Sequence, residues 1–193
     1  MHSKAPIIHR WIVLYPHQDS LGPIFELRNQ LWQSGCRGAK LFPPFALIAP
    51  VAKPASTEVL QTMARLLRGK SLEDSAGGFI TGEIIVLKTL PNNLKLLGIP
   101  LSISIQPEKA GLPAQTNGVT NCLSVPEKPL MPIGIIENQR DHELARSIYQ
   151  RLPPLHFRQG AVANFAFILT VDGSSATAIR WELGKPYWMA RHG

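Results

Sequence analysis

The chain has 193 residues, of which 45% are hydrophobic, and it carries a formal net charge of +7. This length fits one domain with a substantial core, and no stretch approaches the roughly 20 uninterrupted apolar residues of a membrane span. A basic surface favours polyanions such as RNA, DNA, nucleotides or acidic lipid. We expect RNA or a nucleotide as the partner and, without an apolar span, no membrane. The two cysteines, Cys36 and Cys122, lack metal-ligand spacing, so we expect free thiols, no metal and no cofactor. The N-terminus lacks the long apolar region of a signal peptide, which favours a cytoplasmic protein.

The first part of the chain alternates between strand and helix patterns. Residues 7–15 are rich in β-branched and aromatic side chains, which favours a strand. Residues 21–34 carry apolar side chains at helical spacing, which predicts an amphipathic helix. Residues 41–51 are apolar without alternation, so we predict a strand that is buried on both faces.

The middle of the chain predicts a helix, a hairpin and a long irregular segment. A capped helix is expected over residues 56–69. The runs 79–90 and 94–105 flank a Pro-Asn-Asn turn signal, which predicts a hairpin. Residues 106–131 contain four prolines and few periodic apolar positions. Such a segment is typical of a lid or linker, and it divides the chain into two lobes.

The last part of the chain repeats the order of elements seen in the first part. A strand is predicted over residues 132–137 and a helix over 138–152. Strands over 161–171 and 176–183 flank an Asp-Gly turn signal, which predicts a second hairpin. The segment 185–188 is expected to close the sheet.

A short sequence pattern recurs in the two parts. Residues 45–51 and 165–171 share Phe-Ala-(Leu/Phe)-Ile-x-x-Val. We therefore predict an α+β fold with two pseudo-symmetric lobes of antiparallel sheet and outer helices. The whole chain is expected to be a single domain, in which lobe one covers about residues 1–105 and lobe two covers 132–193.

This arrangement resembles the 2H phosphoesterase superfamily, which includes the bacterial RNA 2′,3′-cyclic phosphodiesterases, historically called 2′-5′ RNA ligases. The resembling elements are WIVLYP, FPPFALIAP with its Pro-Pro lead-in, and the closing segment FAFILTVDGSSATAIRWELGKPYW. The resemblance covers most of the chain, least of all residues 106–131. It implies two His-x-(Thr/Ser) motifs facing each other across a groove. One imidazole acts as general base and the other as general acid, and no metal is needed.

The positions that correspond to these motifs carry no catalytic groups. The first histidine would fall on Phe45 and the first hydroxyl on Leu47. The spacing of the repeat places the second motif at Phe165 and Phe167, which are equally apolar. The resemblance thus implies a catalytically degraded phosphoesterase, a pseudoenzyme that binds RNA or a nucleotide phosphate in the groove between the lobes.

Two alternatives stay open. The second motif can instead be aligned with His156-Phe157-Arg158, which keeps one histidine and replaces the hydroxyl by a cation. An active cyclic phosphodiesterase that uses His156 and Arg158 is therefore the second hypothesis. The third is a protein-protein interaction module that docks a protein partner through an apolar former groove and the proline-rich lid.

Basic and aromatic residues near the two recurring segments are the candidates for contact with phosphate or nucleic acid. Trp181 is instead expected to fill the core or the edge of the closing sheet. The candidates are Arg37, Lys40, Lys53, Arg158, Arg180, Lys185, Tyr187 and Trp188.

Overall fold

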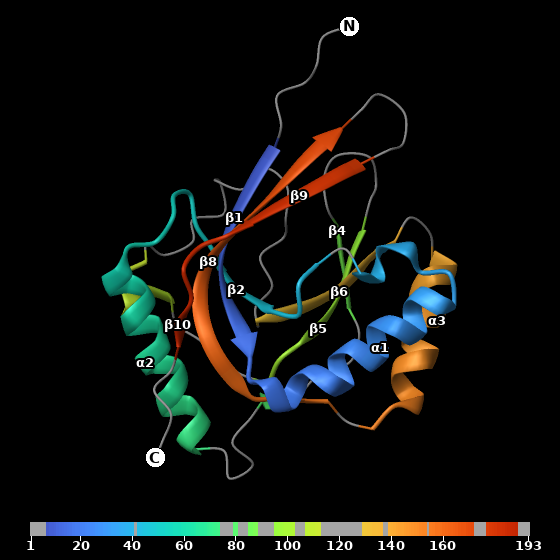
Figure 1. Cartoon of the computed structure of the whole chain (residues 1–193), viewed down its shortest axis with the longest axis horizontal. Helices are drawn as coiled ribbons and strands as arrows, with labels where there is room; N and C mark the ends of the chain where they lie inside the picture. The colour runs from blue at the N-terminus through green and yellow to red at the C-terminus, as the bar shows by residue number, and fades with distance from the viewer. Residues whose placement is uncertain are drawn as a thin grey trace, which may run out of the picture.

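The described residues of the protein form one large antiparallel sheet and three α-helices (Figure 1). The computed structural model describes residues 7–40, 42–73, 79–80, 85–88, 95–102, 107–112, 129–136, 139–153, 155–171 and 177–188. The helices are α1 (Leu21–Gln33), α2 (Thr57–Glu73) and α3 (Gln139–Arg151), with short 3-10 turns at Gln18–Ser20, Arg37–Lys40 and Pro107–Ala110. The strands of the sheet are β1 (Ile7–Pro16), β2 (Ala46–Pro50), β4 (Ile85–Lys88), β5 (Lys95–Pro100), β6 (Leu130–Ile136), β8 (Gln159–Val171), β9 (Thr177–Leu183) and β10 (Tyr187–Trp188). A separate two-stranded pair is formed by β3 (Phe79–Ile80) and β7 (His156–Phe157).

The strands of the large sheet follow the order β10-β8-β1-β2-β6-β5-β4, and β9 also pairs with β8. β8 is long enough to hold both partners, because β10 pairs with Ala161 and Val162 whereas β9 pairs with the stretch from Phe165 onward. The two recurring segments lie on β2 and β8, and both of these strands pair with β1. The predicted α+β class is therefore confirmed.

The sheet narrows between β2 and β6. These two strands share a single pair of opposed residues, Leu47 and Leu130, whereas β1 and β8 pair along ten positions. The strands β8, β1 and β2 thus form one part of the sheet, and β6, β5 and β4 form the other. The division into two pseudo-symmetric lobes stays a prediction.

Side chains alternate between the two faces along each strand, and both faces of β1 contribute buried residues. On β1, Ile12 and Leu14 join a core that also contains side chains of all three helices. Figure 1 shows α1 and α3 side by side and α2 apart from them, against β8 and β10. The opposite face of β1 contributes Trp11 and Val13 to another cluster, which we call the second core. The second core consists of Trp11, Val13, Phe42, Phe45, Leu47, Leu96, Leu130, Ala163 and Phe165.

Most predicted elements are confirmed, with differences at their ends. β2 begins only at Ala46, because Pro43 and Pro44 have no N–H to donate to a neighbouring strand. α2 continues past Gly69 to Glu73, so the predicted end of this helix was wrong. The β4–β5 and β8–β9 hairpins pair antiparallel as predicted. The predicted run 79–90 is not one strand of the first hairpin, however, because β3 pairs with β7 instead.

Some sequence predictions fall on residues outside the described part of the chain. They are the turns at 91–93 and 172–175, most of the predicted lid, and Cys122. Cys36 is a buried free thiol. No helix within the described residues is long and apolar enough to cross a membrane.

Candidate functional site

The positions that the resemblance assigns to catalytic motifs are packed inside the second core. Phe45 and Phe165 are 0% and 2% exposed, and their ring centroids lie 4.4 Å apart. Leu47 is also buried in this cluster. Phenylalanine and leucine side chains neither transfer protons nor bind phosphate. The second core therefore lacks the acid–base pair of the implied mechanism at Phe45 and Phe165.

One polar group borders this cluster. The ring of Tyr15 lies 5.9 Å from that of Phe45, and its buried hydroxyl has no hydrogen-bond partner among the described residues. Burial raises the pKa of Tyr15 to about 12. A phenol with this pKa stays protonated at neutral pH, so Tyr15 is a poor general base there.

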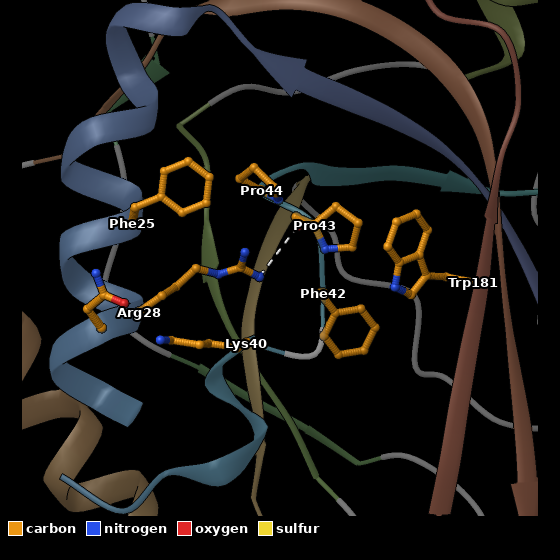
Figure 2. Close-up of a pocket in the computed structure, with 8 residues that line it drawn as sticks. Phe25, Arg28, Lys40, Phe42, Pro43, Pro44 and Trp181 are labelled. Atoms are coloured by element: carbon orange, nitrogen blue, oxygen red, sulfur yellow. Dashed lines mark hydrogen bonds between the residues drawn. The ribbon is translucent and has the colours of Figure 1, made fainter. Parts of the chain in front are cut away.

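A pocket opens beside the Pro-Pro lead-in to β2 (Figure 2). Its volume is about 410 Å³, and it combines basic, amide and aromatic side chains with two prolines. The lining residues are Phe25, Arg28, Asn29, Lys40, Phe42, Pro43, Pro44 and Trp181. We call it the Arg28 pocket.

The amphipathic pattern of α1 carries Arg28 into the protein. Ile24, Leu27 and Leu31 are buried on one stripe of this helix, and position 28 belongs to the same stripe at helical spacing. Arg28 is consequently only 4% exposed. Figure 2 shows its side chain reaching from α1 toward Pro43.

The positive charge of the Arg28 guanidinium has few hydrogen-bond partners among the described residues. Its Nη2 donates to the carbonyl oxygens of Pro43 and Pro132 over 3.4 and 3.5 Å, which are long distances for hydrogen bonds. Its Nε has no partner, and no carboxylate pairs with it, within the described part of the chain. Desolvation lowers the pKa of Arg28 to about 10, so the side chain is still a cation at neutral pH. A buried charge of this kind is costly unless it is paired.

A second cation and two exposed aromatic rings complete the pocket. The Nζ atom of Lys40 lies 5.3 Å from the ring centroid of Trp32, a cation–π contact that holds Lys40 near α1. Phe25 and Trp181 are 47% and 49% exposed. Figure 2 shows Phe25 and Trp181 on opposite sides of Arg28. The pocket therefore offers positive charge at its base and flat apolar surfaces at its walls.

The alternative catalytic residues lie elsewhere. Nη1 of Arg158 is 2.6 Å from Oδ2 of Asp19, which also lies 3.0 Å from Nδ1 of His17. His156 is exposed on β7, and neither His156 nor Arg158 lines the Arg28 pocket. Arg158 is thus paired with Asp19. No acid–base partner of His156 is found among the described residues.

Of the residues predicted to bind phosphate, only Lys40 lines the pocket. Lys53 and Lys185 are exposed at other positions. The hydroxyl of Tyr187 donates to Oγ1 of Thr57 over 3.1 Å, so it is engaged with α2. The side chains of Arg37, Phe167, Arg180 and Trp188 lie outside what the structure describes.

Sequence reasoning assigned neither Arg28 nor Phe25 to a site, and it favoured the core or the edge of the closing sheet for Trp181. Arg28 sits on an otherwise apolar helical stripe, and that misplaced charge was the available signal. Of the two places expected for Trp181, the core is wrong, because its side chain is 49% exposed on β9 and lines the pocket, which no local pattern in the strand indicates.

The described residues contain no group of three or more His, Cys, Asp or Glu side chains able to hold a metal ion. A scan against protein-family models and searches of curated proteins and of solved structures found no match to this chain.

Proposed function

We propose that this chain is a non-catalytic 2H phosphoesterase-like protein that binds a nucleotide, free or as part of an RNA, in the Arg28 pocket. Arg28 and Lys40 hold the phosphate, and the base stacks on Trp181 or Phe25. One observation carries the proposal: Arg28 is a buried cation without a carboxylate partner among the described residues, and it lines a pocket of about 410 Å³.

The charge argument supports an anionic ligand. A guanidinium left without a counterion loses the hydration of its charge and gains little from two long bonds to carbonyl oxygens. A phosphate supplies both the opposite charge and the acceptor oxygens that match the planar fork of arginine. Lys40 adds a second positive charge at the same pocket.

The shape of the pocket supports a ligand with a flat ring. Small-molecule sites commonly have volumes of about 300–1,000 Å³, and the volume of about 410 Å³ falls in this range. Stacking of a base on an aromatic side chain contributes about 1–3 kcal/mol and tolerates any base. The net charge of +7 also favours a polyanion such as RNA.

The non-catalytic part of the proposal rests on the second core. Phe45 and Leu47 occupy the first motif position of the implied family, and both are buried among apolar side chains. The narrow junction at Leu47 and Leu130 is what two sheets meeting at a lobe boundary would produce. It supports the predicted two-lobe arrangement, with the pocket beside Pro43 at that boundary.

The proposal is tested by measuring binding and turnover on the same preparation. We expect salt-sensitive binding of a short RNA and of AMP, weakened about tenfold or more in Arg28→Gln because a charge-assisted hydrogen bond is lost. Arg65→Gln removes an exposed arginine of α2 and serves as the matched control, with unchanged binding.

Turnover is followed with 2′,3′-cyclic nucleotides, which we expect to remain intact. Hydrolysis that disappears in His156→Ala would refute the proposal and favour the active phosphodiesterase. Absence of AMP and RNA binding, together with a specific protein partner, would favour the interaction module instead.

A further inference from the structure

The walls of the Arg28 pocket carry two positive charges and, among the described residues, no negative one. Arg28 and Lys40 both line it (Figure 2), and the other described lining residues are neutral. Arg28 remains a cation at neutral pH, because burial lowers its pKa only to about 10. A ligand with a single negative charge would therefore leave part of this positive charge without a partner.

The hydrogen-bond donors beside the Pro-Pro lead-in are side chains. Pro43 and Pro44 have no backbone N–H, so this part of the wall cannot donate to an anion. The N–H of Phe45, the next one along the chain, already donates to the carbonyl oxygen of Pro43 over 2.9 Å. An anion with several acceptor oxygens can instead be met by the side-chain donors of the lining, which are Arg28, Asn29, Lys40 and Trp181.

The buried position of Arg28 favours a phosphate at the end of a molecule. Arg28 is 4% exposed, whereas Phe25 and Trp181 at the walls are half-exposed. An internal phosphate of an RNA strand carries a nucleoside on each side, and both would have to enter with it. A terminal phosphate carries only one, and the pocket volume of about 410 Å³ lies toward the lower end of the range for small-molecule sites, which is about 300–1,000 Å³.

We propose that the Arg28 pocket selects a terminal phosphate monoester, on a free mononucleotide or at the end of an RNA, over an internal phosphodiester. This selection rests on the proposed function and names its ligand class. A phosphate monoester has a charge of about −1.5 to −2 at pH 7 and three strong acceptor oxygens, whereas each internal phosphate of a strand carries one negative charge.

Lys40 provides the second charge that only the monoester needs. Its side chain is exposed, and its ammonium group lies over the ring of Trp32 at 5.3 Å from the centroid. The flexible four-carbon stem of a lysine allows the ammonium group to move from this ring to a phosphate bound at Arg28. Arg28 thus binds any phosphate that enters, and Lys40 distinguishes the doubly charged one.

Binding of matched ligands to the full chain tests this selection. The ligands are AMP, adenosine and a trinucleotide RNA in three forms, with a 5′-phosphate, with a 3′-phosphate and with hydroxyl groups at both ends. Titration calorimetry is done at one fixed salt concentration, because phosphate contacts depend on salt. We expect AMP and at least one phosphorylated trinucleotide to bind about tenfold or more tightly than the unphosphorylated one. The difference between the two phosphorylated forms identifies the preferred end.

Substitutions separate the roles of the two cations. Arg28→Gln should weaken every ligand that binds, whereas Lys40→Gln should reduce the preference for the phosphorylated trinucleotide about fivefold or more. Lys109→Gln removes an exposed lysine that does not line the pocket, and it should keep the full preference. Circular dichroism of each variant checks that the fold is retained.

The outcomes distinguish this selection from the proposed function. Equal binding of phosphorylated and unphosphorylated trinucleotides, both weakened in Arg28→Gln, would overturn the selection and leave the proposed function intact. An unaltered preference in Lys40→Gln would also overturn it. Failure of AMP and of all three trinucleotides to bind would refute the proposed function and this selection together.

Discussion

Two side chains with buried and poorly satisfied polar atoms, Arg28 and Tyr15, lie among the apolar residues of this interior. Arg28 lines the pocket, and among the described residues its guanidinium donates only long hydrogen bonds to two carbonyl oxygens. The hydroxyl of Tyr15 is buried beside Phe45 without a described partner. Burial of each group lowers the free energy of unfolding, and a substitution at each position measures this effect separately.

Replacing Tyr15 by phenylalanine is expected to stabilise the protein. Tyr15→Phe removes a buried hydroxyl that makes no described hydrogen bond, and should raise the free energy of unfolding by about 1 kcal/mol. The pKa of Tyr15 is about 12 in the folded protein and 10 ordinarily, so the neutral phenol is favoured by folding. This preference contributes fully to the free energy of unfolding below pH 10. The contribution is lost as the pH rises from 10 toward 12, where the unfolded chain ionises first.

Urea unfolding between neutral pH and pH 12 checks this expectation. The wild type should lose stability steeply above pH 10, and Tyr15→Phe should lose less. Tyr187→Phe, which removes a hydroxyl bound to Thr57, is the control and should retain the alkaline loss. Identical pH profiles for wild type and Tyr15→Phe would show that the phenol is not desolvated.

At the scale of elements, β8 pairs with β1, β9 and β10. The side chain of Asn164 on β8 also hydrogen-bonds to Ala55 in the chain before α2. Oδ1 of Asn164 accepts from the N–H of Ala55, and Nδ2 donates to the carbonyl oxygen of the same residue, each over 2.8 Å. The backbone oxygen of Asn164 also accepts from Gly184 over 2.9 Å. The side chain thus satisfies both backbone groups of one loop residue.

Asn164→Ala should therefore lower the free energy of unfolding by about 2–3 kcal/mol, because two hydrogen bonds are lost and both groups of Ala55 are left unpaired. Gln61→Ala removes an exposed amide from α2 and should change stability by less than about 0.5 kcal/mol. Equilibrium denaturation of both variants measures this difference in the free energy of unfolding. A loss no larger in Asn164→Ala than in the control would mean that this pair of bonds is not made in solution.

The elements themselves were largely predictable, because each depends on local pattern. The β-branched run of β1 and the apolar stripe of α1 gave strands and helices close to those observed. The pairing of β8 with β1 joins residues far apart in the chain, and no local signal specifies it. The same holds for the pocket, since Arg28 on α1 and Trp181 on β9 line it together although they are far apart in the chain.

At the scale of the molecule, the second core is closed and apolar, whereas the Arg28 pocket is open and basic. The second core holds Phe45 and Phe165 in contact where the implied family requires histidines. The pocket beside Pro43 holds a cation whose pairing within the described chain is incomplete. We infer that the protein keeps a costly charge for a ligand rather than for stability, a trade often seen at binding sites.

Thermal unfolding of the wild type and of Arg28→Met, each with and without AMP, tests this inference most directly. Without ligand, Arg28→Met should be as stable as the wild type or up to about 2 kcal/mol more stable, because a desolvated charge is replaced by an unbranched apolar side chain. Saturating AMP should stabilise the wild type by about 2–3 kcal/mol, a rise of several degrees, and should leave Arg28→Met unchanged. An equal rise in both proteins, or no rise in the wild type, would contradict the assignment of Arg28 as the residue that binds phosphate.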